Sequence, residues 1–244
     1  MIDWLRDDHQ NPAITVGDTS LPIAIRRHAR AKRLTMRLAP DGSEVRVTLP
    51  TWGRTLDAVT FAKARTDWLA TQLAKVPRRM AIVDGEQISY RGMPLQITWD
   101  AQAGRKAVVD DGVLRIGGPA EGLESRVRRW LEAEALRLCR DDLEFYCQRA
   151  DLPCPDMRLS RAQRRWGSCS GNGRTGRCIR INWRLVMAPD HVRRSVVAHE
   201  VAHLVHFDHS PAFHALLAKL FEGTLAEADG WLKRDGRTLY AGFG

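Results

Sequence analysis

The residues best suited to chemistry are two histidines, His199 and His203, and a glutamate, Glu200, that directly follows the first of them. Residues four positions apart lie on the same face of a helix, so the two imidazoles can bind one metal ion. Glu200 can then reach a water molecule on that metal and act as its general base. This HExxH pattern is typical of hydrolases that contain catalytic zinc.

A catalytic zinc ion takes three protein ligands and keeps a fourth position open, so a third ligand is expected from outside the pair. His206 is unfavourable, because seven residues of helix separate it from His199 by about 10 Å along the axis. His209 directly precedes Ser210-Pro211, which predicts a helix N-cap and first position, and a turn before it would fold its side chain back toward the metal. Glu222, on the following helix, is the alternative third ligand.

The metal-binding helix is expected over residues 189–206. Pro189 and Asp190 would begin it, and apolar residues recur along one of its sides. The hydrophobic pattern around it predicts a long helix, three short strands and a further helix: Leu123–Arg149, Met157–Ala162, Trp166–Ser170, Cys178–Trp183 and Ala212–Phe221. An exposed strand beside the metal-binding helix can hold an extended peptide by backbone pairing.

The preceding part of the chain is expected to be rich in β-structure. Residues 34–38 and 45–49 alternate apolar and polar side chains on either side of Pro40-Asp41-Gly42, which predicts a β-hairpin. A helix is predicted over 55–76, and further strands at 87–90, 95–99, 106–109 and 113–116. Because glycine and proline are concentrated at 118–122, three regions are expected, namely a loosely ordered N-terminus, a β-rich module with one helix, and a catalytic domain: residues 1–20, 21–118 and 123–244.

Four motifs are similar in order and spacing to those of one protein family. They are Arg165-Trp166-Gly167-Ser168-Cys169, Ile181-Asn182-Trp183-Arg184-Leu185, His199 to His203, and His209-Ser210-Pro211-Ala212-Phe213. With these motifs the chain resembles the YgjP-like metallopeptidases, zincins related to the SprT-like and WLM-type metalloproteases. The resemblance implies Zn2+ bound by His199, His203 and His209, with Glu200 as general base.

The same resemblance implies an α+β fold: a zincin-like metallopeptidase domain with a long helix, a small β-sheet, the HExxH helix and C-terminal helices, preceded by a β-rich N-terminal module. Arg165, Trp166, Gly167 and Ser168 are then candidates for the substrate cleft. Gly167 would let a substrate backbone approach closely, and Arg165 is a candidate for stabilising the oxyanion. Metzincins share the histidine spacing but place glycine at the position of His206 and a methionine-containing turn after the third ligand, whereas every methionine here precedes the motif.

The amino-acid composition limits the kinds of partner that the protein is expected to have. With a net charge of +9, the chain has ten arginines against two acidic residues over 156–194, and six basic residues without an acidic one over 26–37. Such surfaces attract phosphate groups or acidic segments, so a nucleic-acid partner is one hypothesis, and composition bias toward arginine is the other.

Five cysteines without a CxxC pair are expected to be free thiols, largely buried. Charged residues interrupt the N-terminus and no apolar run is long enough to span a bilayer, so a cytoplasmic protein without a membrane partner is expected.

The favoured function is zinc-dependent hydrolysis of peptide bonds in polypeptide substrates. An amidase or deformylase that acts on small substrates would use the same residues and differ only in the shape of its cleft. A basic, nucleic-acid-associated protease, of the type that processes DNA–protein crosslinks, or a structural zinc protein is a further alternative. A purely structural site is disfavoured by Glu200, because such a site closes with a fourth ligand and needs no base.

Overall fold

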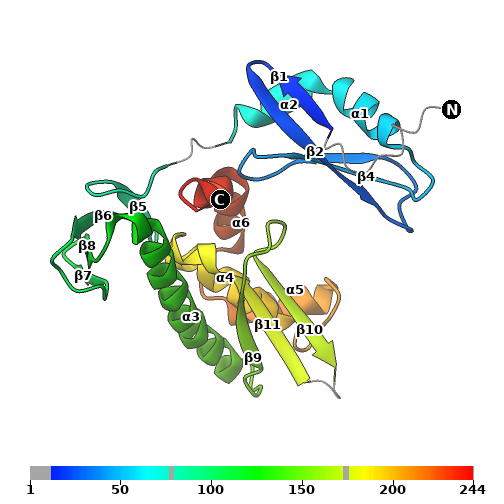
Figure 1. The fold of residues 1–244 in the computed structure, drawn as a ribbon. Coiled ribbons are helices and arrows are strands. Elements are labelled where there is room, and N and C mark those ends of the chain that lie inside the picture. The colour runs from blue at the N-terminus through cyan, green and yellow to red at the C-terminus, as the bar shows by residue number, and fades with distance from the viewer. Residues whose placement is uncertain (1–11, 77–79, 173–175, 244) are drawn as a thin grey trace. The chain divides into compact units, whose positions relative to one another are not determined.

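The computed structural model describes residues 12–76, 80–172 and 176–243. By its contacts the chain divides into two compact units, residues 1–79 and 80–244. Within the described residues the architecture is mixed α and β, with three small sheets and six α-helices (Figure 1). The fold is therefore α+β, as predicted.

The first unit is a four-stranded sheet with two helices. Its strand order is β1-β2-β4-β3, and the elements are β1 (Ala13–Val16), β2 (Thr19–Arg27), β3 (Thr35–Leu38), β4 (Val45–Leu49), α1 (Thr55–Lys63) and α2 (Thr66–Leu73). The predicted hairpin of β3 and β4 is confirmed by their antiparallel pairing. Residues 13–16, expected to be loosely held, form a strand, while residues 1–11 lie outside the described part. The single helix expected over 55–76 is wrong, because the helical geometry is interrupted at Arg65, whose φ of −128° is non-helical.

The second unit begins with another four-stranded sheet, in the order β5-β6-β8-β7. Its strands are β5 (Gln87–Tyr90), β6 (Met93–Asp100), β7 (Val108–Asp110) and β8 (Val113–Gly117). All four had been predicted within a few residues of these bounds. The turn from β7 to β8 uses Asp111 and Gly112, both at positive φ, which suits a two-residue hairpin turn.

The two four-stranded sheets have the same topology and the same register. In each sheet an antiparallel hairpin is joined through a parallel pair to a second antiparallel hairpin. Paired apolar residues correspond as well: Ile14–Leu21, Ile23–Val45 and Leu38–Val45 of the first sheet match Ile88–Leu95, Ile97–Leu114 and Val109–Leu114 of the second. The chain therefore contains an internal structural repeat, a feature that hydrophobic patterning alone did not reveal.

The remainder of the second unit consists of helices and a small sheet. The elements are α3 (Leu123–Arg149), β9 (Asp156–Ser160), β10 (Gly167–Asn172), β11 (Gly176–Asn182), α4 (Asp190–Ala202), α5 (Pro211–Leu220) and α6 (Leu225–Asp235). Figure 1 shows α4 beside the long helix α3, and both α4 and α3 also contact the sheet of β9, β11 and β10. That sheet has the order β10-β11-β9, so β10 is an edge strand. The connection between β10 and β11 includes residues 173–175, which lie outside the described part.

The division between the two units lies at residues 79 and 80, whereas the glycine-rich stretch at 118–122 lies within the second unit. The reason is that the second sheet shares one buried cluster with α3 and α4. The turn between β5 and β6 also binds the segment before α4, since the N–H groups of Arg91 and Gly92 donate to the carbonyls of Val186 and Met187 at 2.8 and 3.1 Å. Packing, rather than the local concentration of glycine, thus sets the boundary.

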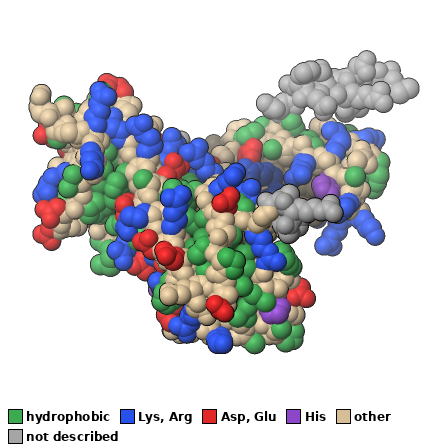
Figure 2. Space-filling view, turned by 90° about the horizontal axis from the view of Figure 1, so that it is seen from below, with side chains coloured by type: hydrophobic (Ala, Val, Ile, Leu, Met, Phe, Trp, Pro, Cys, Tyr) green, Lys and Arg blue, Asp and Glu red, His purple; other side chains and the backbone are tan. Residues whose placement is uncertain are grey.

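The surface is rich in charge, and basic side chains are spread over the face seen in Figure 2, with acidic ones between them.

All five cysteines are free, as expected, but only Cys139 and Cys147 are buried. Cys169 and Cys178 are half-buried and Cys154 is exposed. Within the described residues, no helix has the length and apolar character needed to cross a bilayer.

Candidate metal centre

Three imidazoles converge at the end of α4. His199 lies in the last turn of the helix, His203 is its C-cap residue, and His209 lies in the loop directly before Ser210, the N-cap of α5. The Nε2 atoms of His203 and His209 lie 3.1 and 3.3 Å from Nε2 of His199. Among the described residues, this group has ligand atoms that all lie within 4.8 Å of one another and could hold a metal ion.

The helix ends earlier than residue 206, and its end orients one of the imidazoles. Nδ1 of His203 lies 2.9 Å from the carbonyl oxygen of His206, and because a carbonyl only accepts, the ring N–H donates there. In the neutral ring, that bond places the proton on Nδ1 and so leaves Nε2 of His203 available as a ligand. His206 therefore contributes its backbone carbonyl, a role that its residue type could not indicate.

Phe213 is the residue that packs the three imidazoles together. It is fully buried on α5, and its ring centroid lies 5.0, 4.6 and 4.9 Å from those of His199, His203 and His209. The Ser210 hydroxyl accepts a hydrogen bond from the Phe213 backbone N–H at 3.4 Å and so begins the helix at this point. The sequence reasoning included Phe213 only as part of a motif and did not assign it this packing role.

The electrostatics of the cluster keep His199 neutral. Burial, together with the neighbouring His203 and His209, lowers the pKa of His199 to about 4. A metal ligand must be the neutral imidazole, so His199 is in the binding form across the physiological pH range.

Glu200 lies beside the histidines but points to the sheet. Its side chain is buried, with an exposed fraction of 5%, and Oε2 has no hydrogen-bond partner among the described residues. Burial raises the pKa of this carboxyl to about 7, although a hydrogen bond from the Cys169 backbone N–H and the charge of Arg165 both lower it. Removing a carboxylate from water without a partner is costly, so the orphaned Oε2 indicates a site arranged for a proton or a ligand.

Gly167 is required by this position of Glu200. A Cβ atom at residue 167 would lie 2.4 Å from Oε1 and 2.7 Å from Cγ of Glu200, closer than real Cβ contacts. Any other residue at 167 would therefore displace the carboxylate. The sequence assigned Gly167 to the approach of a substrate backbone, whereas here its missing side chain accommodates Glu200.

A cleft of about 510 Å³ lies beside Glu200 and His199. Of the four residues predicted to line the cleft, Arg165, Trp166 and Gly167 do so, and Ser168 is not among the lining residues. The opposite wall is largely apolar and is formed by residues of α4, α5 and α6, which were not predicted: Val196, Leu217, Leu225, Ala226 and Leu232. His214 and Asp229 add polar groups to the lining.

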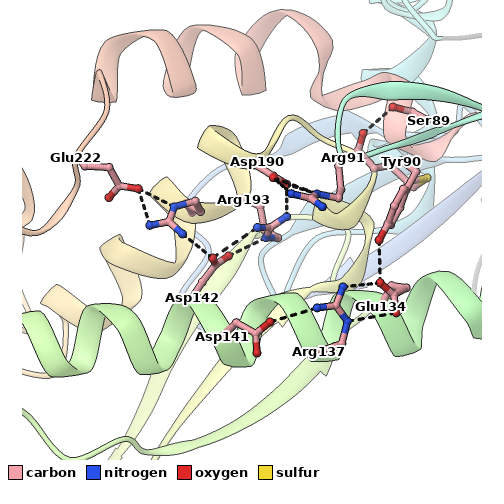
Figure 3. Close-up of polar contacts among 12 residues, drawn as sticks. Ser89, Tyr90, Arg91, Glu134, Arg137, Asp141, Asp142, Asp190, Arg193 and Glu222 are labelled. Carbon is pink, nitrogen blue, oxygen red and sulfur yellow. Dashed lines mark hydrogen bonds and ion pairs between the residues drawn. The ribbon is translucent and has the colours of Figure 1, made fainter. Parts of the chain in front are cut away.

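Glu222, the alternative third ligand, is directed elsewhere. Its carboxylate accepts hydrogen bonds from the Tyr146 hydroxyl at 2.8 Å and from Arg194 at 2.6 Å. Figure 3 shows Glu222 bound to a guanidinium group. These contacts tie the end of α5 to α3 and α4. Glu222 therefore belongs to a structural charge network, and the structure brings His209 to the other two histidines instead.

Many of the arginines in residues 156–194 are used inside the second unit. Arg193 is buried and bonds to Asp142 at 2.7 Å, and Arg194 reaches the same carboxylate at 3.1 Å (Figure 3). Arg161 pairs with Glu132 at 2.8 Å, and the buried Arg184 donates to the carbonyl of Phe243. Arg174 lies outside the described residues. The excess of arginine in this region therefore overstates its free positive charge.

Comparison with known proteins gives one assignment. The model of the YgjP-like metallopeptidase domain matches residues 32–235. No curated protein and no solved structure matches the chain significantly. The matched range contains the histidine cluster, Glu200 and all the residues that line the cleft, so the motif, the geometry and the comparison agree. The chain belongs to the YgjP-like metallopeptidase family.

Proposed function

We propose that this metallopeptidase cleaves polypeptides with a zinc ion held by His199, His203 and His209, and with Glu200 as general base. The observation that carries the proposal is the convergence of three imidazole nitrogens beside a buried glutamate whose Oε2 has no partner. The zincin-like arrangement of the catalytic region is part of the same proposal. It rests on the position of the HExxH helix α4 beside a small sheet with β10 at its edge.

The chemistry and spacing of the donors support zinc. Imidazole nitrogens bound to one tetrahedral zinc ion at roughly 2.0–2.1 Å lie about 3.3–3.4 Å apart. The separations of 3.1 and 3.3 Å from His199 are close to this value. Three neutral imidazoles are a common donor set for zinc and leave one position open. When bound there, zinc would polarise the scissile carbonyl and lower the pKa of the attacking water.

Glu200 supplies the proton transfer. Its Oε2 would take a proton from the attacking water and pass it to the amine that leaves as the peptide bond breaks. The Cys169 N–H holds the carboxylate against β10, and the absent side chain of Gly167 makes room for it. A pKa raised to about 7 suits a group that both accepts and returns a proton near neutral pH.

The cleft beside a sheet edge favours polypeptide over small amides. An extended peptide can pair with the free edge of β10 and place its backbone next to Glu200. Such pairing needs several residues of substrate, which a small amide or a formyl group does not offer. The apolar wall formed by Leu217, Leu225 and Leu232 would contact an aliphatic or aromatic side chain of the substrate.

The role of Glu200 is tested by Glu200→Gln, which keeps the shape of the side chain and removes the base. We expect hydrolysis of a quenched fluorescent peptide library to fall by at least ~100-fold, with zinc content unchanged. Glu227→Gln, an exposed change on α6, serves as the matched control and should leave hydrolysis intact. Undiminished cleavage by the Glu200 variant would exclude it as the base.

The metal ligands are tested by zinc analysis of three variants. His209→Ala should lose most of its zinc. His206→Ala should keep zinc, because the backbone carbonyl that orients His203 is retained. Glu222→Ala should also keep zinc, because its carboxylate binds Tyr146 and Arg194. Zinc loss only in the Glu222 variant, or equal loss in the two histidine variants, would overturn the assignment.

A further inference from the structure

The first unit carries a continuous stretch of positive charge. Residues 26–37 contain six basic side chains and no acidic one. All six are exposed: Arg26, Arg27, Arg30, Lys32, Arg33 and Arg37. Within the part of the chain that the structure describes, no salt bridge involves Arg26, Arg30, Lys32, Arg33 or Arg37. Exposed cations gathered without carboxylates repel one another, so this arrangement does not serve stability.

The fold places two of these cations, Arg26 and Arg37, on the outer face of the first sheet. Ile23 and Val47 point into the core shared with α1 and α2, so the alternate residues of the strands face outward. Arg37 of β3 pairs with Arg46 of β4, and Arg26 of β2 pairs with Thr48 of β4. The outer face therefore carries Arg26, Arg37 and Arg46, and residues 28–34 connect β2 to β3 at its end.

An exposed tryptophan lies next to this surface. Trp52 follows β4 and is 75% exposed, the highest fraction among the large hydrophobic side chains described. Arg27 holds the same segment, since it donates to the carbonyl of Gly53 at 3.3 Å and to the hydroxyl of Thr55 at 3.0 Å. The His28 N–H also donates to the carbonyl of Leu49. The exposed indole thus lies in a segment that is anchored at the end of β2, where the connection with Arg30, Lys32 and Arg33 begins.

The repeat shows that the fold does not require these cations. In the second sheet, the residues whose register matches 26–37 are 100–108, and they contain two basic residues, Arg105 and Lys106, and one acidic residue, Asp100. Arg46 has a counterpart in Arg115, and each pairs with a carboxylate, at 2.5 Å with Glu44 and at 3.2 Å with Asp110. The same topology and register are therefore built with two cations in this stretch in place of six. Apart from Arg27, the basic residues of 26–37 call for a ligand rather than a folding role.

We propose that residues 26–37 and Trp52 form a binding surface for single-stranded nucleic acid. The guanidinium and ammonium groups bind successive phosphates, and the Trp52 indole stacks on a base. Five of the six cations in 26–37 are arginines, whose planar guanidinium binds phosphate through two hydrogen bonds and also stacks on bases. An unpaired strand is favoured over a duplex, because only unstacked bases can lie on an exposed indole.

This surface is suited to nucleic acid better than to an anionic membrane. Insertion into a bilayer interface needs a cluster of apolar side chains, whereas Trp52 is the one large apolar side chain exposed among the described residues of 26–37 and 50–53. The surface is also independent of the catalytic cluster, which belongs to the other unit. Binding through it would add an anchoring site to the peptidase.

The test measures binding of the full chain to a fluorescein-labelled single strand of about 15 nucleotides by fluorescence anisotropy. The first variant combines Arg30→Gln, Lys32→Gln and Arg33→Gln. Its control combines Lys106→Gln, Arg129→Gln and Arg140→Gln, exposed cations of the second unit whose removal lowers the net charge equally. We expect the affinity of the first variant to fall about tenfold or more at moderate salt. The plot of its log affinity against log salt concentration should also become less steep, because about two fewer counterions are released on binding. The control should bind as the unchanged chain does.

Trp52→Ala is expected to weaken binding about fivefold or more without altering the salt dependence, because stacking releases no counterions. A blunt duplex and vesicles of phosphatidylserine and phosphatidylcholine complete the comparison and should bind more weakly. The proposal is overturned if the single strand does not bind, if both triple variants weaken it equally, if the Trp52 variant binds normally, or if the duplex or the vesicles bind as tightly. Peptide hydrolysis by the first variant should remain intact, which separates this surface from the catalytic site.

Discussion

The two four-stranded sheets of this protein share topology and register but differ in what lies at their turns and loops. In the second sheet, the turn at Arg91 and Gly92 is bound by the backbone before α4, and Arg91 forms an ion pair with Asp190 at 2.5 Å. In the first sheet, the corresponding turn at Gly17 and Asp18 is exposed. The second sheet is thus packed against the segment that begins α4, whereas the corresponding turn of the first sheet is exposed.

The difference extends to how arginine is used. In the second unit, arginines connect helices through carboxylates, as Arg193 of α4 does with Asp142 of α3, and Arg193 also pairs with Asp190 of its own helix (Figure 3). In residues 26–37 of the first unit, five cations have no such partner within the described residues. The same residue type therefore stabilises one unit and forms an accessible charged surface on the other. Composition alone could not distinguish these two uses.

The comparison predicts the largest loss of stability at Asp142. This carboxylate is buried between Arg193 and Arg194, so Asp142→Asn leaves the buried Arg193 guanidinium with only the part-exposed Asp190 as a counter-charge. We expect the free energy of unfolding of the second unit to fall by about 3–5 kcal/mol in urea denaturation. The control in the first unit, Glu44→Gln, breaks a half-exposed pair with Arg46 and should cost less than about 1 kcal/mol. Equal losses would refute the contrast.

A second effect concerns pH and the metal-free protein. The pKa of Glu200 is raised by burial from its ordinary 4.5 to about 7, so the folded state holds this proton more tightly than the unfolded state. Its contribution to stability is complete below pH 4.5 and is lost as pH rises through 7. As the pH rises from 4.5 to 7 in the presence of a chelator, the free energy of unfolding of the unchanged chain should fall by about 3 kcal/mol relative to that of Glu200→Gln. Chemical denaturation measures this difference. Parallel stability curves for the two proteins would contradict this.

A smaller effect separates the turn glycines of the two repeats. At Gly92, with φ of +79°, an added Cβ would lie 2.8 Å from Cα and Cγ of Pro189. At Gly17, with φ of +58°, nothing lies within 4 Å. Gly17→Ala should cost about 1 kcal/mol from backbone strain alone, and Gly92→Ala should cost about 1–2 kcal/mol more. Similar melting temperatures for the two variants would show that the second turn is not tightly packed.

Much of the catalytic region follows from local sequence rules. The helix α3 has the predicted bounds, and Ser210-Pro211 begins α5 as its capping pattern indicates. The convergence of His199, His203 and His209 was also predicted, because helical spacing and one turn determine it. These features depend on interactions between residues close in sequence.

The remaining features depend on contacts between distant segments. The space that Gly167 leaves for Glu200, the packing of Phe213 against three imidazoles, and the ion pairs of Glu222 each join separate elements. The repeat was missed for a related reason, since pairing register is conserved between the sheets while most residue identities are not. The arginine-rich stretch 156–194 suggested an open basic surface, and only the three-dimensional contacts show how many of its charges are paired.

The backbone bonds from Arg91 and Gly92 to Val186 and Met187 also have a consequence for local opening. Amide protons in a hairpin turn ordinarily exchange with solvent quickly, because little structure must open to release them. Here the two amides can exchange only when the turn leaves the segment that precedes α4. Their exchange rates therefore report the cooperative opening of the catalytic unit, whereas the turn at Gly17 and Asp18 reports only its own hairpin.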